Sequence, residues 1–171
     1  MLQRSIAVGH NLVPGSLSFD ETGNTAWAAT TNGSIVTVRL LDRRIELLGS
    51  GYRRPVAVIP GHDGLTVSVV ERSGRVWRAR RDQASRTSAQ LVTDLPGRAL
   101  TARRHPDAAR ILVLTATAGD TAMSSIDLND GTITAIASGL TDAVMFTVDK
   151  GRRELVVLSI CLLYTSDAAD E

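Results

Sequence analysis

The sequence predicts an all-β fold, namely a partial β-propeller of four-stranded antiparallel blades with about 3.5 blades present. Short apolar runs rich in Val, Ile, Thr and Trp alternate with Gly, Asn, Asp and Pro, which is the pattern of strands and tight turns. No segment keeps an apolar period of 3.6 residues long enough for a helix, so helices are expected only in loops. A third observation, an internal repeat at a spacing of 40 to 45 residues, indicates propeller blades.

The repeat is clearest between residues 17 and 38, where three short apolar runs are joined by two turns. The turn glycines recur 41 residues later, and one of them recurs after 45 residues more. In chain order they are Gly23 and Gly33, Gly64 and Gly74, and Gly119. Asn-Gly and Asp-Gly steps tolerate the positive φ that tight hairpins need, so each glycine marks a strand-to-strand turn.

A connector precedes each blade and joins an apolar outer strand to an apolar inner one. The connectors are residues 9–14, 49–55, 93–97 and 138–142. The blades are expected at about 16–48, 56–92, 99–137 and, in part, 143–160, within one incomplete propeller of residues 1–160. A leftover outer strand is expected at Ser5-Ile6-Ala7-Val8. Because propellers close rings of typically 4 to 8 blades, the chain is expected to lack part of its ring.

Residues 161–171 break this pattern, since they have neither turn chemistry nor periodicity. They resemble the translation of a transposase adapter used to prepare DNA sequencing libraries, and we expect a non-native tail after a truncation near Ile160. A native acidic tail is the alternative. Without the tail the only cysteine, Cys161, is lost, and 19 basic residues face 15 acidic ones, a balance of +4. That balance is too mild to predict a nucleic-acid partner.

Composition is that of a soluble globular protein, with 43% hydrophobic and 22% charged residues. The first residues contain no apolar run long enough for a secretory signal or a membrane span, which favours a cytoplasmic location. Lys150 is the only lysine, and this bias toward arginine, with the many alanines, favours a bacterial, GC-rich gene of metagenomic origin.

The order of outer strand, Gly-Leu or Gly-Tyr, proline or turn, and inner strand ending in an Asp-x-x-Gly turn resembles the NHL, YVTN and SMP-30/gluconolactonase-like propellers over residues 5–159. The pattern departs from WD40 repeats, because no blade ends in Trp-Asp and Gly61-His62 follows an inner strand. The metal-binding Glu, Asn and Asp set of the lactonases has no clear counterpart here. The resemblance therefore implies a binding platform more strongly than an enzyme.

In a propeller, the outer-to-inner connectors and the turns between second and third strands share one face, called here the upper face. In the families that the chain resembles, most ligand sites lie on this face, and loops on a rigid scaffold often carry function. The residues expected there are His10, Asn11, Thr31, Asn32, Tyr52, Arg53, Arg54, Glu71, Arg72, Asp94, Asp120 and Thr141. They predict a surface for a protein or small-molecule ligand, with solvated turn residues as the simpler interpretation.

The rival hypothesis is a propeller enzyme of the lactonase or quinoprotein type. Such an enzyme should place acidic and amide side chains on successive inner strands. The inner strands instead offer, between apolar positions, Ser18, Ala57, Thr101 and Thr147. The binding interpretation is favoured, no catalytic residue is assigned, and the sequence names no cofactor.

Three other residue groups receive structural interpretations. His10, His62 and His105 lie in different loops, so a zinc site with converging ligands is not expected. Five arginine pairs occur, four of them expected in lower-face turns that also carry aspartates, so we expect a mixed-charge surface and no nucleic-acid site. Trp27 and Trp77 are expected to pack between neighbouring blades.

Overall fold

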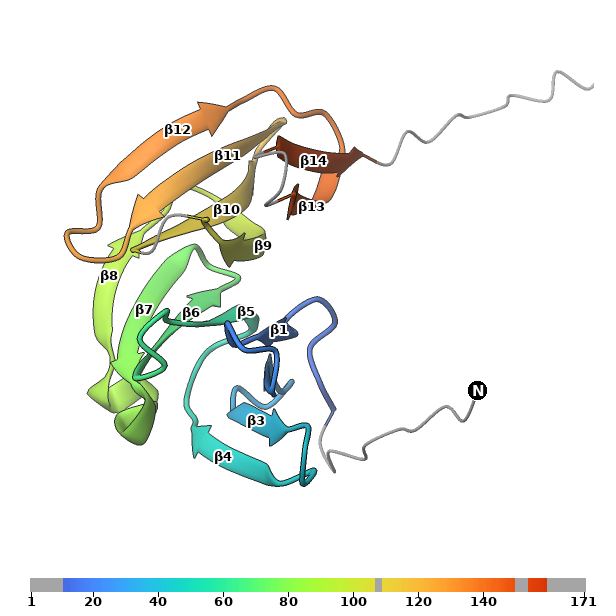
Figure 1. Ribbon diagram of the computed structural model, residues 1–171. Helices are drawn as coiled ribbons and strands as arrows, with labels where there is room; N and C mark the ends of the chain where they lie inside the picture. Colours follow the sequence, from blue (N-terminus) through green and yellow to red (C-terminus); the bar gives the residue numbers. More distant parts are fainter. Residues whose placement is uncertain (1–10, 107–108, 150–153, 160–171) are drawn as a thin grey trace, which may run out of the picture.

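The computed structural model describes residues 11–106, 109–149 and 154–159. Within these ranges the strands form three four-stranded antiparallel sheets and one two-stranded sheet, arranged around an open arc (Figure 1). Each sheet runs in sequence order from an inner to an outer strand. The all-β, partial-propeller prediction is therefore confirmed. The expected strand Ser5-Ile6-Ala7-Val8, residue His10 and the tail 161–171 lie outside the described residues.

Blade 1 contains β1 (Ser18–Phe19), β2 (Thr25–Ala29), β3 (Ile35–Arg39) and β4 (Ile45–Gly49). The β1–β2 turn is closed by Asp20, whose Oδ1 accepts the backbone N–H groups of Asn24 at 3.0 Å and Thr25 at 3.2 Å. An aspartate that bonds its own turn in this way replaces backbone hydrogen bonds that the strands cannot supply.

Blade 2 contains β5 (Pro55–Pro60), β6 (Thr66–Glu71), β7 (Arg75–Arg80) and β8 (Gln90–Asp94). The short 3-10 helices η1 (Arg81–Gln83) and η2 (Arg86–Ser88) fill the β7–β8 loop, in line with helices being expected only in loops. Within the described residues, no helix has the length and apolar character to cross a membrane.

Blade 3 contains β9 (Arg98–Arg104), β10 (Arg110–Thr117), β11 (Asp120–Asp127) and β12 (Ile133–Ala137). The two-stranded sheet contains β13 (Ala143–Asp149) and β14 (Glu154–Ser159). One expectation is corrected here, because Arg103 and Arg104 lie within β9 and not in a lower-face turn. Their partly buried guanidinium groups contact the segments on either side of β1: Arg103 donates to the Gly15 carbonyl at 3.2 Å, and Arg104 pairs with Glu21 at 3.6 Å.

Strand register gives every blade two apolar faces. We call the face toward the preceding blade the rear face and the face toward the next blade the front face. In each blade, rear-face residues of the second strand pair with rear-face residues of the third. These residues are Ala26, Ala28, Val36 and Val38 in blade 1, Val67, Val69, Trp77 and Ala79 in blade 2, and Ile111, Val113, Ser124 and Ile126 in blade 3. Successive side chains of a strand point to opposite faces, so the residues between them form the front faces.

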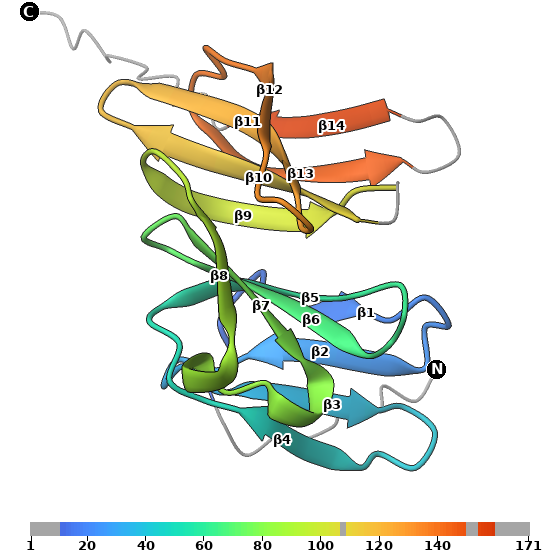
Figure 2. The ribbon, with the colours of Figure 1, turned by 90° about the vertical axis from the view of Figure 1, so that its left-hand side faces the viewer.

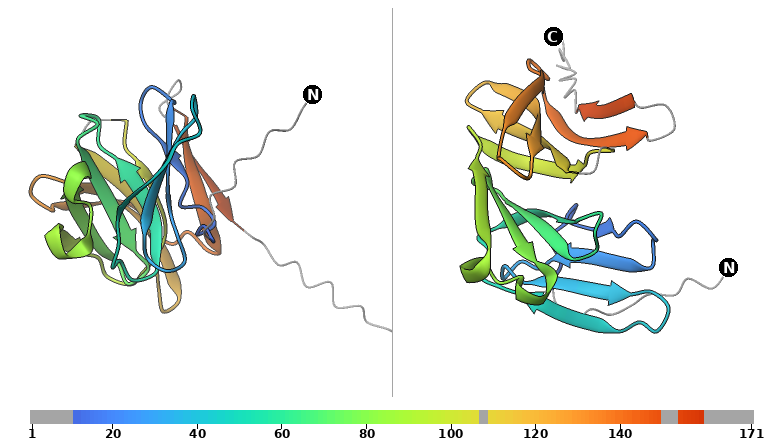
Figure 3. Two further views of the ribbon diagram at one scale, coloured as in Figure 1. Left: turned by 90° about the horizontal axis from the view of Figure 1, so that it is seen from below. Right: turned by 60° about the vertical axis from the view of Figure 1, so that its left-hand side comes forward.

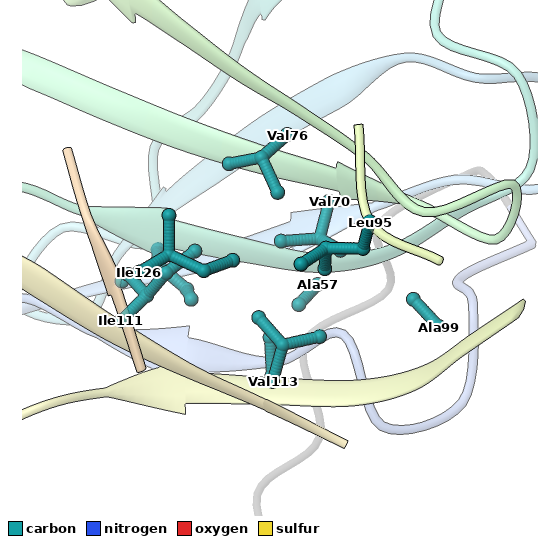
Figure 4. Packing of buried hydrophobic residues seen from close by; sticks show 10 residues of the cluster. Ala57, Val70, Val76, Leu95, Ala99, Ile111, Val113 and Ile126 are labelled. Atoms are coloured by element: carbon teal, nitrogen blue, oxygen red, sulfur yellow. The ribbon is translucent and has the colours of Figure 1, made fainter. Parts of the chain in front are cut away.

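Three buried clusters hold the sheets together, one at each junction. Figure 4 shows the cluster between blades 2 and 3, where Val70 and Val76 of one blade meet Ile111, Val113 and Ile126 of the next. At the junction of blades 1 and 2, Trp27 is 1% exposed and Trp77 packs against the same cluster. The third cluster joins blade 3 to β13 and β14. Both tryptophans thus pack between blades as expected, since large aromatic side chains bury much apolar area.

Candidate binding surface

Four arginine side chains surround an open hollow of about 1180 Å³ at the upper ends of blades 1 to 3. The β4–β5 connector, the β6–β7 turn and the start of β9 supply them, and these segments lie at the left-hand end of the sheets in Figure 2. The polar lining residues are Thr31, Arg53, Arg54, Arg72, Ser73 and Arg98. All are exposed, and no carboxylate is among the described residues that line the hollow.

Backbone hydrogen bonds tie the arginine-bearing segments to one another. The N–H of Arg72 donates to the carbonyl of Arg54 at 2.9 Å, and the N–H of Ala99 donates to the carbonyl of Arg72 at 3.1 Å. Arg72 in the β6–β7 turn is therefore hydrogen-bonded on one side to Arg54 and on the other to Ala99, the residue after Arg98. The spacing of these side chains is therefore set by sheet packing and does not depend on loop conformation alone.

Arg54 has a backbone φ of 48°. This left-handed region is uncommon for residues other than Gly, Asn and Asp, and it costs of order 1–2 kcal/mol. The surrounding hydrogen bonds hold Arg54 there, next to the hollow. Arg43 and Asp142 share this conformation outside the hollow, so it fixes the direction of the Arg54 backbone without marking a binding site by itself.

The guanidinium groups of these four arginines have no ion-pair partner within residues 11–106, 109–149 and 154–159. By contrast, three arginines away from the hollow each pair with an aspartate: Arg39 with Asp42 at 3.2 Å, Arg80 with Asp82 at 3.3 Å and Arg110 with Asp127 at 3.6 Å. The hollow therefore gathers unpaired positive charges on a concave surface, and the electrostatic field of such a surface attracts anions.

A buried carboxylate lies beneath the hollow and holds one of its walls. Glu71 ends β6 and is 1% exposed. Its Oε1 accepts the backbone N–H of Arg53 at 2.7 Å and the Nε–H of Arg86 at 3.2 Å. The guanidinium of Arg86 stacks over the ring of Trp77 at 4.4 Å from its centroid. Glu71 was expected as an upper-face residue, but it acts from below, by positioning Arg53.

Tyr52 also differs from its expected exposed position. It is 3% exposed, and its hydroxyl donates to the carbonyl of Ala84 at 2.9 Å. The side chain therefore joins the β4–β5 connector to the β7–β8 loop and is not part of the exposed upper face. Burial of its phenol, together with the nearby charge of Glu71, raises the pKa of Tyr52 to about 12, which Arg86 partly opposes.

We expect the raised pKa of Tyr52 to make the protein less stable in alkali. A pKa that is higher in the folded chain than its ordinary 10.0 means that the stabilisation is fully present below pH 10 and is lost as the pH rises toward 12. Chemical unfolding measured from pH 8 to pH 12 should show this loss. In Tyr52→Phe the alkaline loss should become much smaller. An equal loss in both proteins would contradict the assignment.

Four other predicted face residues are exposed but lie outside the lining of the hollow. Asn32 caps its own turn, where its Oδ1 accepts the N–H of Ser34 at 3.2 Å. Asp94 pairs with Arg75 at 3.4 Å, and Asp120 accepts the N–H of Gly139 at 2.9 Å. Asn11 accepts the N–H of Thr31 through its carbonyl at 2.9 Å. The side chains of Asn32, Asp94 and Asp120 and the backbone of Asn11 thus hold turn and strand ends. The predicted residues that line the hollow are Thr31, Arg53, Arg54 and Arg72.

Arg98 belongs to the hollow and was not expected there. The repeat could have indicated it. In each blade one residue at the start of the inner strand pairs with an equivalent residue near the end of the second strand, and the pairs are Leu12 with Thr30, Pro55 with Glu71 and Ala99 with Thr115. The residue before each is therefore equivalent too, and these are Asn11, Arg54 and Arg98. Aligning the connectors by their position before the inner strand would have revealed this basic residue.

Metal chemistry finds no support in the described part of the chain. No group of three or more His, Cys, Asp or Glu side chains there could hold a metal ion. His62 contacts Glu21 in the lower turns, away from the hollow.

The sheet topology, the inner-to-outer strand order and the arc of repeated blades define a protein of the β-propeller class. Solved structures that the chain resembles are propellers as well. The nidogen/laminin complex matches with a TM-score of 0.63 at 16% identity, over 84% of this chain and 55% of that chain. Putative TolB from Agrobacterium tumefaciens matches with a TM-score of 0.64 at 14% identity, over 85% of this chain and 53% of that chain.

Sqt1 from Saccharomyces cerevisiae gives a TM-score of 0.55 at 17% identity, over 85% of this chain and 42% of that chain. At these identities the likeness shows the fold alone. The chain spans just over half the length of the first two structures that it resembles. No protein-family model matches the sequence, and no curated protein matches it.

Proposed function

We propose that this chain is a β-propeller binding module whose arginine hollow binds an acidic segment of a partner protein. The observation that carries the proposal is the convergence of four arginines without ion-pair partners among the described residues around one hollow of about 1180 Å³. Arginine presents a planar fork of donors that matches a carboxylate with two parallel hydrogen bonds. Several such forks in a concave surface suit a run of Asp or Glu side chains.

The size and chemistry of the hollow favour a peptide segment over a small molecule. Small-ligand pockets are typically about 300–1,000 Å³ and largely enclosed, whereas this hollow is larger and open. Its apolar lining, from Val13, Pro55 and Val56, can contact the aliphatic parts of a peptide. No aromatic residue lies among the described lining residues, so the stacking platforms typical of single-stranded nucleic-acid sites are missing there.

We test the proposal with a fluorescein-labelled octaglutamate peptide as the probe. Fluorescence anisotropy should show binding that weakens as salt is added, because surface charge interactions are screened. The Arg54→Glu/Arg72→Glu variant should bind at least about 10-fold more weakly, since hydrogen bonds to charged groups contribute about 1.5–3 kcal/mol each.

The matched control is Arg43→Glu/Arg44→Glu in the β3–β4 turn. It makes the same change in net charge, and Arg43, with a φ of 58°, shares the left-handed backbone of Arg54. If both variants bound the peptide equally weakly, net charge alone would explain the loss of binding, and the proposal would be contradicted. Tighter binding of a labelled oligodeoxythymidine with the same number of charges would contradict the choice of a protein partner.

We also propose that the chain groups with the NHL, YVTN and SMP-30-like propellers, and that residues 1–160 form one propeller unit with 161–171 outside it. The support is the connector pattern of the sequence together with the propeller fold. Of the inner strands, β1, β5 and β9 contain no carboxylate, whereas β13 ends at Asp149.

A further inference from the structure

Three arginines of the hollow, Arg54, Arg72 and Arg98, form a row across the junction of blades 2 and 3, called here the arginine row. Arg54 and Arg72 are direct neighbours, because the N–H of Arg72 donates to the carbonyl of Arg54 at 2.9 Å. The Arg72 carbonyl in turn accepts the N–H of Ala99, the residue after Arg98, at 3.1 Å. Backbones joined in this way lie about 5 Å apart. An extended arginine side chain exceeds that spacing, so the three guanidinium groups can contact one ligand together.

Close backbone contacts hold the segments of the arginine row in place. Gly74, in the β6–β7 turn, lies against the β8–β9 connector: a Cβ built on it would be 2.6 Å from the carbonyl oxygen of Leu95. The N–H of Leu95 also donates to the carbonyl of Gly74 at 3.1 Å. Gly97, directly before Arg98, lies as close to blade 3, since a Cβ there would be 2.6 Å from the carbonyl oxygen of Ala116. A ligand therefore meets arginines whose backbone positions are already fixed, which lowers the entropic cost of binding.

The arginine row lies in the middle of the arc of blades. The right-hand view of Figure 3 shows blade 2 between blade 1 and blade 3, so the β6–β7 turn that carries Arg72 has a blade on either side. The hydrogen bonds that form the row join residues between 54 and 99, within the continuous described range 11–106. The row therefore does not depend on how the arc continues beyond the described residues.

The charge and the donors of the arginine row match a phosphate monoester better than a single carboxylate. No carboxylate lines the hollow among the described residues, and Ser73 adds a hydroxyl beside Arg72. A carboxylate has two oxygens, which one arginine fork already engages with two parallel hydrogen bonds. A phosphorylated side chain carries a charge of about −1.5 to −2 at pH 7 and three strong acceptor oxygens. Such a group can accept hydrogen bonds from all three arginines at once.

We propose that the arginine row binds a phosphorylated side chain within the acidic segment of the partner protein, so that phosphorylation of the partner strengthens binding. This inference rests on the proposed function, because it specifies which group of the segment contacts the row. Arg53 lies outside the row, and its N–H is held by Glu71 at 2.7 Å. Its guanidinium group remains for a neighbouring Asp or Glu of the same segment, while Pro55 and Val56 offer apolar contact beside the row.

The experiment compares two fluorescein-labelled peptides of equal length and nearly equal charge with the full chain. One is octaglutamate, and in the other a phosphoserine and an alanine replace two adjacent glutamates. Fluorescence anisotropy should show at least about 10-fold tighter binding of the phosphopeptide, since one additional hydrogen bond between charged groups corresponds to about that factor.

Acidification provides a second readout. Lowering the pH from about 7.5 to about 5.5 should weaken phosphopeptide binding more than octaglutamate binding, because the second pKa of a phosphate monoester is about 6 and that of a glutamate side chain is about 4.3. The described lining residues of the hollow include no histidine or carboxylate whose titration could produce this difference.

Arg98→Gln should remove most of the preference for the phosphopeptide, because it deletes one arginine of the row. Arg53→Gln is the matched control. It removes the same charge from the same hollow, so it should weaken both peptides by similar factors and keep the preference. Loss of the preference in both variants would contradict the row as the phosphate site.

The two peptides also separate this inference from the proposed function. Equal affinity of the unaltered protein for both would overturn the inference and leave the proposed function standing, whereas failure of both to bind would overturn the two together. Inorganic phosphate should displace the labelled phosphopeptide far less well than the unlabelled phosphopeptide does. Equal displacement would mean that the row binds free phosphate, and it would contradict a phosphorylated partner segment.

Discussion

Replacing Glu71 with alanine is expected to lower the free energy of unfolding by about 3–5 kcal/mol, because it removes one partner of a buried ion pair. The change leaves the N–H of Arg53 without its acceptor and leaves Arg86 without a counter-ion. The Arg86 side chain keeps 25% of its surface in water, so the loss should fall toward the lower end of this range. Urea unfolding measures the difference, through the change in midpoint at constant slope.

Glu46→Ala is the matched control for this prediction. Glu46 also pairs with an arginine, Arg81 at 3.8 Å, but its side chain is 48% exposed. An exposed pair of this kind contributes about 0–1 kcal/mol. Glu71→Gln should fall between the two, since an amide oxygen still accepts from Arg53. Equal losses for Glu71→Ala and Glu46→Ala would show that burial does not strengthen the Glu71 contacts.

The second large effect is expected at Gly33, in the β2–β3 turn. Gly33 has a φ of 85°, and a Cβ placed there would lie 2.0 Å from the carbonyl oxygen of Tyr52. Gly33→Ala must therefore shift the backbone that leads into Arg53, in addition to adopting a left-handed conformation. We expect a loss of more than about 3 kcal/mol, combining left-handed strain of about 1–2 kcal/mol with the clash.

Gly23→Ala separates these two costs. Gly23 has a φ of 71°, but nothing lies within 4 Å of a Cβ built there. Only the backbone cost remains, so the expected loss is about 1–2 kcal/mol. Thermal and urea unfolding of both variants give the comparison. Similar losses at the two glycines would mean that the Tyr52 backbone moves aside freely, and that the β4–β5 connector is not held by this contact.

The fold class could be predicted from the sequence because its signals are local and repeated. Alternation of apolar residues, turn glycines and the recurring connectors all lie within one blade, so each copy indicates the same four-stranded unit. The packing of Trp27 and Trp77 between blades could be predicted for the same reason, since every blade needs apolar cover on both faces. Arg103 and Arg104 were misplaced because β9 continues past its apolar stretch and carries both of them within the sheet.

The binding surface could be predicted only in part. Arg53, Arg54 and Arg72 were expected on the upper face because connectors and second turns share that side of any propeller, and all three line the hollow. Tyr52 and Glu71 were expected beside them, yet both are buried, since a neighbouring loop covers one and a neighbouring connector covers the other. Contacts of this kind join residues far apart in the chain, so they cannot be predicted from the residues of a turn alone.

The sequence by itself therefore determined the strands, the turns, the repeat and the face on which the connectors meet, because those follow from side-chain period and backbone preference within short segments. Only the tertiary structure decided that Arg54, Arg72 and Arg98 converge and that Glu71 holds Arg53 through its backbone N–H. The physical reason is that sheet packing sets distances between blades, and a hollow or a buried ion pair exists only once two blades are in contact.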